Sequence, residues 1–405
     1  MTRRPAILLL ALLALAPAAA GAQDDARQPD ESLLAPSFQV GPLRMRPSLI
    51  LREVGYDSNV LNVPRSGGAD FTATFGGRVD TRLEGARVAV TSSSFTEYAY
   101  YEAHRTERGA NGGTEGRVEF RVGRMRPHVS AGIFSSQERP TAEIDRRARR
   151  VQAMGDIGIA APLATRTTVT AGYRRTSSGY APEEQFRGVQ LASALNGTSS
   201  AFSFGAALAL TPLTTVAVGG ERVEDRFEHS PGRDANLHRV AVSATFHPLA
   251  LVSGRASVGL RTLRPVRGQL RPFTGLTASV AVAYLHGDAS RIAVTLDRDL
   301  RYSYSAETPY YVATGTRASF TRRLLGRVDA QVLGGLERLA YKARPDLVRG
   351  PAGTDGVRTV GGGIGYRLTG GTRVGITVER ASRASAVPDR TFSRTRVYTT
   401  LSYGY

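Results

Sequence analysis

Apolar and polar residues alternate along most of the chain that follows residue 42. In residues 116–123, GRVEFRVG, the side chains of Val118, Phe120 and Val122 share one face of an extended strand, and the charged side chains between them share the other. Similar stretches recur with a spacing of about 20 residues, separated by clusters of Gly, Pro, Asp and Asn. The pattern predicts an all-β protein made of antiparallel hairpins, each with one apolar and one charged face.

Eighteen candidate strands follow from this alternation. They span residues 43–57, 70–83, 86–101, 114–123, 126–137, 149–161, 167–178, 198–211, 214–228, 235–247, 252–263, 272–285, 290–304, 310–323, 327–342, 356–368, 372–383 and 391–405. A single hairpin of this kind fits a soluble β-sandwich equally well, because its charged face would then meet bulk water. The whole set favours a membrane barrel, since many strands exceed the usual length of about 5–6 residues and the apolar face contains no Trp.

The connections between these strands alternate between short and long. Tight turns are expected at 84–85, 162–166, 211–215, 247–251, 324–327 and 369–371, and longer loops at 58–69, 102–113, 138–148, 179–197 and 343–355. Outer-membrane barrels place short turns at the periplasmic end and long loops at the other end. We therefore predict a transmembrane antiparallel outer-membrane β-barrel of about 18 strands (16–18), wide enough to leave a water-filled interior.

The first 42 residues do not follow the alternating pattern. Residues 1–22 have a basic start, an apolar run shorter than the roughly 20 residues of a membrane-spanning helix, and a small-residue end, which is typical of a cleaved signal peptide. We interpret residues 23–42, which are acidic and contain Pro, as a periplasmic lead-in to a barrel at 43–405. The predicted location is the outer membrane of a Gram-negative cell, after Sec-type export.

The last ten residues, RVYTTLSYGY, predict the strand that closes the barrel. Val397, Leu401, Tyr403 and Tyr405 share its apolar face, and the chain ends on an aromatic ring. A closing strand must be fully paired, because backbone groups find no water partner in lipid. We interpret these four residues as an insertion signal for the barrel-assembly machinery, and outer-membrane lipid as the partner of the apolar face.

The composition is strongly basic and lacks cysteine. The formal net charge is +18 at pH 7, and Lys342 is the one lysine among 53 basic residues. Such basicity can indicate nucleic-acid binding. The predicted export and the absence of a compact basic run argue against it, so we expect no nucleic-acid partner. Without cysteine, no disulfide can stabilise the fold.

Arginines and acids gather in the polar phase of the predicted strands. We predict that the pore is lined by Arg78, Asp80, Arg82, Arg117, Glu119, Arg121, Arg174, Arg239, Arg255, Arg261, Asp297, Asp299, Arg301, Arg373, Glu379, Arg394 and Arg396. An excess of guanidinium over carboxylate groups around a narrow aqueous space favours anions. The alternative, equally open from the sequence, is that these arginines pair with the acids and brace the barrel wall.

Two arginines do not fit this assignment. Arg298 falls in the phase of Leu296 and Leu300, and Arg380 falls in that of Val378. A lipid-facing arginine near the bilayer midplane costs about 2–4 kcal/mol. Either these side chains reach the membrane surface, or the strand register differs from our assignment at these positions.

No combination of residues predicts an enzyme. The chain has no GxSxG, HExxH or P-loop motif, and its one His–Ser adjacency, His229-Ser230, precedes Pro-Gly and predicts a turn. Asp57, Ser58 and Asn59 could contact a calcium ion, but Asp and Asn at a strand end more often stabilise a turn. We expect no catalytic site, no metal and no cofactor.

Tyrosines gather near predicted strand ends, at 98–101, 302–311 and 403–405. Such rings suit an interfacial girdle, in which the ring lies in lipid and the hydroxyl in water. The alternative is a track on which sugar rings stack. The strand-end placement favours the girdle.

Several stretches of the chain resemble a known family. GYDSNV (55–60), TPLTTVAVGGE (211–221), RFEHSPGRDAN (226–236), FHPLALVSGRASVGLRTLRP (246–265) and RDLRYSYSAETPYYV (298–312) are similar to the putative β-barrel porin family of outer-membrane proteins, often encoded near exopolysaccharide genes. The resemblance implies the fold and the outer-membrane location, but no substrate. Two functions stay open: a passive channel for small solutes, anionic ones above all, and a structural partner in exopolysaccharide export, with polysaccharide as its ligand. A homo-oligomer is compatible with both.

Overall fold

The computed structural model describes residues 38–403, except residues 65–67, 248–249, 268–269, 288, 347–352, 369–371 and 388. The predicted signal peptide and most of the lead-in lie outside the described residues. Both therefore stay predictions.

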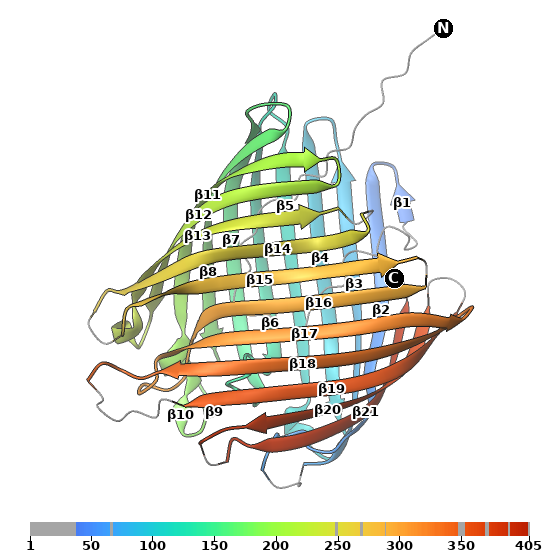
Figure 1. Ribbon diagram of the computed structural model, residues 1–405, viewed down its shortest axis with the longest axis vertical. Coiled ribbons are helices and arrows are strands. Elements are labelled where there is room, and N and C mark those ends of the chain that lie inside the picture. The colour runs from blue at the N-terminus through green and yellow to red at the C-terminus, as the bar shows by residue number, and fades with distance from the viewer. Residues whose placement is uncertain are drawn as a thin grey trace.

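Eighteen long strands form one closed antiparallel barrel (Figure 1). They are β2 (Leu43–Asp57), β3 (Asp70–Glu84), β4 (Val88–Tyr101), β5 (Gly109–Phe120), β6 (Arg126–Glu138), β7 (Ala148–Pro162), β8 (Thr167–Tyr180), β11 (Gly197–Thr211), β12 (Thr214–Phe227), β13 (Ala235–Phe246), β14 (Val252–Pro265), β15 (Phe273–His286), β16 (Ser290–Tyr302), β17 (Tyr310–Leu325), β18 (Val328–Lys342), β19 (Thr354–Arg367), β20 (Arg373–Ala384) and β21 (Phe392–Tyr403). Each pairs with its neighbours along the chain, and β21 pairs with β2. The predicted fold and strand number are confirmed.

The remaining elements are short. β1 (Phe38–Val40) pairs with the start of β2, and β9 (Gln185–Phe186) pairs with β10 (Val189–Gln190) in a small hairpin. The helix α1 (Leu191–Leu195) and two single turns of 3₁₀ helix lie in the connections. In the part of the chain that the structure describes, no helix is long and apolar enough to cross a membrane.

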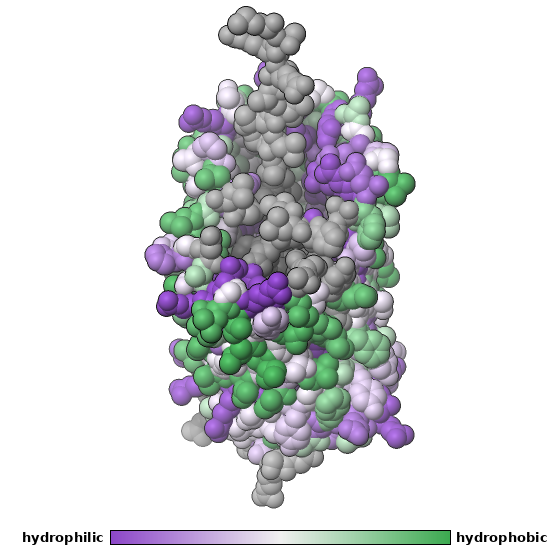
Figure 2. Space-filling model, turned by 90° about the vertical axis from the view of Figure 1, so that its right-hand side faces the viewer, coloured by the Kyte–Doolittle hydropathy of each residue, from purple (hydrophilic) through white to green (hydrophobic). Residues whose placement is uncertain are grey.

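The apolar phase of the strands faces away from the barrel interior. Phe71, Phe75, Val79 and Leu83 of β3 are between 37% and 51% exposed, and Ile376 of β20 is 56% exposed. Figure 2 shows hydrophobic side chains gathered in a patch on one face of the molecule, with hydrophilic side chains at its margins. A β-sandwich would bury this phase against a second sheet. The exposed apolar band is instead the surface that a lipid-facing barrel needs.

The connections alternate in length, as expected. Eight of them, at one end of the barrel, have two to five residues, and nine, at the other end, have seven to sixteen. We call the second end the long-loop end. One strand boundary was wrong: β5 begins at Gly109 and not at residue 114, because the glycine-rich stretch GANGG pairs with β4 despite its low strand propensity.

The seam between β2 and β21 contains a β-bulge. The register shifts between Leu51 and Val54, and Glu53 lies in the left-handed region with φ of 56°. Gly55 lies so close to the Val397 carbonyl that a Cβ at this position would collide with it. A side chain at residue 55 would therefore disturb the pairing that closes the barrel.

A pair of introduced cysteines can test this seam, because the chain has none of its own. Tyr56 and Val397 are paired across it, and their side chains are 53% and 42% exposed. Since Cα atoms of paired residues lie about 4.5–5.5 Å apart, we expect Tyr56→Cys with Val397→Cys to form a disulfide on mild oxidation. The crosslinked barrel should resist heat unfolding on SDS gels until it is reduced.

The matched control is Tyr56→Cys with Ile364→Cys, which places both thiols on the outer face but on unpaired strands. Crosslinking of the control, or none of the seam pair, would contradict the observed closure.

Candidate pore constriction

One long loop crosses the inside of the barrel. Residues 139–147, RPTAEIDRR, connect β6 to β7, and we call this segment the strap. Arg139 Nη2 donates to the Val60 carbonyl, and Asp145 Oδ2 pairs with Nη1 of Arg383 on β20 at 3.0 Å. In the sheet, β5, β4, β3, β2 and β21 separate β6 from β20. The strap therefore spans the space between distant parts of the wall.

Glu143 is the most deeply buried charged residue of the strap, with 1% exposure. Its carboxylate accepts hydrogen bonds from Ser303 Oγ at 2.6 Å and from the Tyr304 backbone N–H at 3.3 Å. Burial raises the pKa of this carboxyl to about 7, although these hydrogen bonds and the guanidinium groups of Arg390 and Arg383 act in the opposite direction. The charge of Glu143 therefore changes near neutral pH.

Two arginines connect the strap to the far wall. Arg383 donates to a strap carbonyl at 2.9 Å and pairs with Asp355 of β19. Arg390 Nη2 donates to the Tyr341 hydroxyl of β18 at 2.7 Å and to the Glu143 carbonyl at 3.4 Å. Each guanidinium thus bonds to the strap and to the wall at once, which its planar set of N–H donors permits.

The tip of the β16–β17 hairpin meets the strap from another direction. Residues Tyr310–Ala313 are buried on both faces of β17, and Leu300 of β16 belongs to the same buried cluster as Leu263 of β14. Because β15 lies between β14 and β16 in the sheet, the tip must bend across β15 to make this contact. The Tyr302 hydroxyl, at the end of β16, donates to Asp225 of β12 at 2.9 Å.

The burial of three tyrosines corrects the predicted tyrosine girdle. Tyr101, Tyr310 and Tyr311 are 9%, 2% and 0% exposed, so they do not lie at a lipid surface. Tyr98 does remain on the outer face, where its ring lies 5.4 Å from that of the exposed Phe75. The stacking of sugar rings on the tyrosines stays a prediction.

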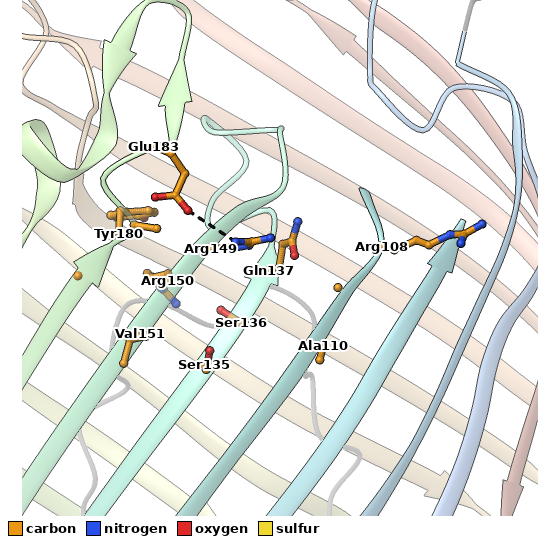
Figure 3. A pocket seen from close by; sticks show the side chains of 13 residues that line it. Arg108, Ala110, Ser135, Ser136, Gln137, Arg149, Arg150, Val151, Tyr180 and Glu183 are labelled. Atoms are coloured by element: carbon orange, nitrogen blue, oxygen red, sulfur yellow. Dashed lines mark ion pairs between the residues drawn. The ribbon is translucent and has the colours of Figure 1, made fainter. Parts of the chain in front are cut away.

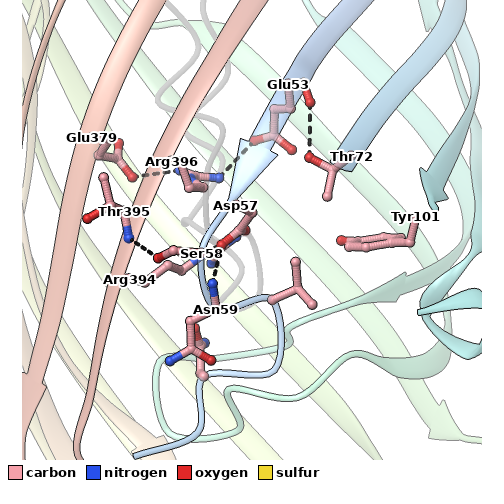
Figure 4. A network of polar contacts seen from close by, with 12 residues as sticks. Glu53, Asp57, Ser58, Asn59, Thr72, Tyr101, Glu379, Arg394, Thr395 and Arg396 are labelled. Carbon is pink, nitrogen blue, oxygen red and sulfur yellow. Dashed lines mark hydrogen bonds and ion pairs between the residues drawn. The ribbon is translucent and has the colours of Figure 1, made fainter. Parts of the chain in front are cut away.

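Figure 4 shows a cluster of polar contacts at the seam. Arg394 binds both carboxylate oxygens of Asp57, and the Asn59 N–H donates to Asp57 Oδ1 at 3.0 Å. These contacts are those of a turn stabilised by Asp, as one of our two interpretations expected. Within the described ranges, no group of three or more acidic or histidine side chains could hold a metal ion.

The bulge adds a partner that the sequence did not reveal. Glu53 Oε1 lies 3.2 Å from Arg396 Nη1, and Arg396 Nη2 pairs with Glu379 at 2.6 Å (Figure 4). Regular alternation would have placed Glu53 with Leu49 and Leu51, on the lipid side. The register shift turns its carboxylate to the polar side instead.

Most of the predicted pore-lining arginines are held by acids. At least nine of the twelve form ion pairs among the described residues, namely Arg78–Asp80, Arg82–Glu84, Arg117–Glu119, Arg174–Asp156, Arg261–Asp299, Arg301–Asp297, Arg373–Asp329, Arg394–Asp57 and Arg396–Glu379. Arg121, Arg239 and Arg255 donate to uncharged oxygens. For these nine arginines, the contacts support the alternative in which arginines pair with acids and stabilise the barrel wall. A role of any of the twelve in solute passage stays a prediction.

The predicted insertion signal is described only in part. Val397 and Leu401 lie on the outer face of β21 and are 42% and 36% exposed. β21 ends at Tyr403, and Tyr405 lies outside the described residues. The recognition of these residues by an assembly machinery stays a prediction.

A groove at the long-loop end lies outside the pore. It has a volume of about 580 Å³, and its lining includes Gln137, Arg149, Val151 and Glu183 (Figure 3). Arg149 pairs with Glu183 at 3.6 Å, and both side chains are 62% exposed. Val151, in the outer phase of β7, is 47% exposed. The groove therefore opens on the outer surface of the barrel.

The residues that fix the strap are not among the predicted pore residues. Glu143, Asp145, Arg383 and Arg390 lie in or beside loops, whereas the predicted pore residues lie in strands. The segment RPTAEIDRR does carry a signal, because five of its nine residues are charged. Such a charged segment can be buried inside a barrel only where other polar side chains or backbone groups bond to it.

Comparisons with known proteins agree with this architecture. The family model described as Putative beta-barrel porin 2 matches residues 38–404. A BenF-like porin from Pseudomonas fluorescens Pf-5 is 11% identical and has a TM-score of 0.50, with 89% of this chain and 99% of that chain covered. The outer membrane protein OpdK from Pseudomonas aeruginosa is 11% identical over the same shares, with a TM-score of 0.49. At such identity the likeness shows the fold alone.

No curated protein matches the chain in sequence. The family model, in contrast, covers nearly all of the barrel that the structure describes. The chain therefore belongs to the putative beta-barrel porin 2 family, and it forms a porin-like channel in the outer membrane of a Gram-negative bacterium.

Proposed function

We propose that the channel passes small anionic solutes passively and that the strap narrows it. The observation that carries the proposal concerns two arginines, the half-buried Arg139 of the strap and the buried Arg233 beside the β16–β17 loop. Arg139 donates to the carbonyls of Val60 and Asp145, and Arg233 donates to two carbonyls of the β16–β17 loop. Burial lowers the pKa of both to about 10, so both stay charged at pH 7.

These two charges differ from those of the wall. Among the described residues, neither guanidinium forms an ion pair with a carboxylate. A carbonyl satisfies the N–H groups without cancelling the positive charge. While Glu143 is protonated, a passing anion at the strap would therefore meet a positive potential that the wall pairs do not supply. The carboxylate of Asp57 opposes part of the charge of Arg139.

The wall arginines that we predicted as pore-lining belong to the same proposal. They alternate along the strands with exposed apolar residues, which supports their position on the water-filled side. We assign the long-loop end to the cell surface and the short turns to the periplasm, following the general plan of such barrels. The export-partner function stays a prediction, because no described contact favours it.

Release of the strap should widen the pore. Asp145→Asn removes the charge that pairs with Arg383, and a hydrogen bond to a charged group contributes about 1.5–3 kcal/mol. The population of undocked straps should then rise about tenfold or more. We expect more frequent large openings in single-channel recordings from planar bilayers.

The control for this experiment is Asp346→Asn, which breaks the ion pair between Arg344 and Asp346 in another long loop. It should leave the conductance at the wild-type value. If Asp145→Asn and the wild type show the same single-channel openings, the strap does not narrow the pore.

The buried carboxyl of Glu143 predicts a pH dependence. The groups that face it are Ser303, Tyr304, Arg390, Arg383, Arg233, Tyr311 and Tyr341. Because the pKa is raised to about 7 in the docked strap, docking is favoured while Glu143 is protonated and weakens as the pH rises to about 7.

We therefore expect the conductance of the wild type to increase between about pH 4.5 and pH 7 and to level off above pH 7. Glu143→Gln cannot ionise and should keep the low conductance over this range, whereas Glu183→Gln, which changes an exposed loop carboxylate, should behave as the wild type. Identical pH profiles for Glu143→Gln and the wild type would rule out control by this carboxyl.

The charge selectivity can be measured as a reversal potential across a salt gradient. We expect preference for chloride over potassium, and a weaker preference at 1 M salt, where the Debye length is about 3 Å. Arg117→Gln with Arg121→Gln should reduce the preference without unfolding the barrel, because Glu119 keeps Arg126 as a partner at 3.4 Å. The outward-facing Arg322→Gln is the control. Preference for cations in the wild type would refute the proposal.

A further inference from the structure

Three arginines lie on the outer face of neighbouring strands near the long-loop end. Arg338 of β18, Arg358 of β19 and Arg380 of β20 are all exposed, and we call them the arginine row. Each is two residues away from an exposed apolar side chain of its own strand, namely Leu336, Val360 or Val378. Residues two apart in a strand point to the same side. The arginine row therefore continues the lipid-facing apolar band toward the long-loop end.

The strand register brings the three side chains close together. Arg358 pairs with Leu336 on β18 and with Ser382 on β20. Arg338 and Arg380 are each two residues from these partners, so they are diagonal neighbours of Arg358, at about 7–8 Å. One phosphate-bearing headgroup can contact adjacent guanidinium groups at this spacing.

The strand register also shows on which face Arg298 and Arg380 lie, the two arginines that did not fit the sequence assignment. Arg298 and Arg338 both pair with Thr314 of β17, and Arg298 Nη1 donates to Thr314 Oγ1 at 2.7 Å. Arg380 is exposed on the same side as Val378. The register does not slip at either position, so these arginines do belong to the outer phase.

No acid compensates the arginine row from within the described part of the chain. Glu337, Asp355 and Glu379 lie one or three residues from the row on its own strands, which places them on the opposite side. Asp355 and Glu379 pair there with Arg383 and Arg396. Two other arginines of the outer face do have acidic neighbours, in the pairs Arg149–Glu183 and Arg222–Glu224.

We propose that the arginine row binds the phosphate groups of an anionic lipid in the leaflet that surrounds the long-loop end. A guanidinium group matches phosphate in geometry and charge. Arginine facing hydrocarbon is costly but is tolerated at the level of the headgroups. The exposed Leu336, Val360 and Val378 would contact the acyl chains of the same lipid. With the long loops at the cell surface, this lipid is a phosphorylated glycolipid of the outer leaflet.

The test uses the full-length barrel purified in a neutral detergent. Native mass spectrometry measures binding of a bisphosphorylated glycolipid, of the same glycolipid without phosphates, of phosphatidylglycerol and of inorganic phosphate. We expect the wild type to bind the bisphosphorylated glycolipid best and inorganic phosphate least. The triple variant Arg338→Gln, Arg358→Gln, Arg380→Gln should bind the glycolipid about tenfold or more weakly, because each lost guanidinium removes charge-assisted hydrogen bonds.

Arg322→Gln is the matched control, since Arg322 is exposed in the outer phase of β17 near the short-turn end. It should bind the glycolipid as the wild type does. Heat-modifiable migration and single-channel conductance should be unchanged in the triple variant, which shows that the barrel is intact. Equal binding of the glycolipid without phosphates, tighter binding of phosphatidylglycerol, or an equal loss in Arg322→Gln would each overturn the proposal.

Discussion

The pairing of β2 with β21 is the constraint on which the rest of the structure depends. An unpaired backbone group in hydrocarbon costs several kcal/mol, so a membrane sheet must close on itself. At the seam, a bulge at Glu53 and the close approach of Gly55 to the Val397 carbonyl make that closure possible. Once the sheet is closed, strict alternation sends every second side chain to lipid and the others to the interior. The apolar band and the polar wall thus follow from one requirement.

Closure leaves an interior that side chains from the wall cannot fill, because a barrel of 16–18 strands encloses a wide lumen. The strap and the β16–β17 tip enter this space from different sides and meet at Glu143. The Glu143 carboxylate is bonded by Ser303 and Tyr304 of the tip, whereas Arg383 and Arg390 bind the Asp145 carboxylate and the Glu143 backbone carbonyl from the far wall. The same contacts therefore keep the strap folded and hold it between distant parts of the wall.

The sequence predicted what depends on local pattern and missed what depends on distant partners. Most strand ends were placed within a few residues, because alternation is visible over a single strand. The strap could not be predicted in this way, since Ser303 and Arg383 lie more than 150 residues from it in the chain. The predicted tyrosine girdle was wrong for the same reason. A strand end near Tyr310 suggests a position at the water–lipid interface, and only the bent hairpin tip shows that the ring is buried.

The arginines of the chain lie in three different environments, which the amino-acid composition alone could not distinguish. In the wall, arginines such as Arg373 are cancelled by acids such as Asp329. At the strap, Arg139 donates to the carbonyl oxygens of Val60 and Asp145 and forms no ion pair among the described residues. On the outer face, Arg358 has neither kind of partner among the described residues and faces the surroundings of the barrel. The role of each arginine therefore depends on the group that its guanidinium contacts, and not on the number of arginines in the chain.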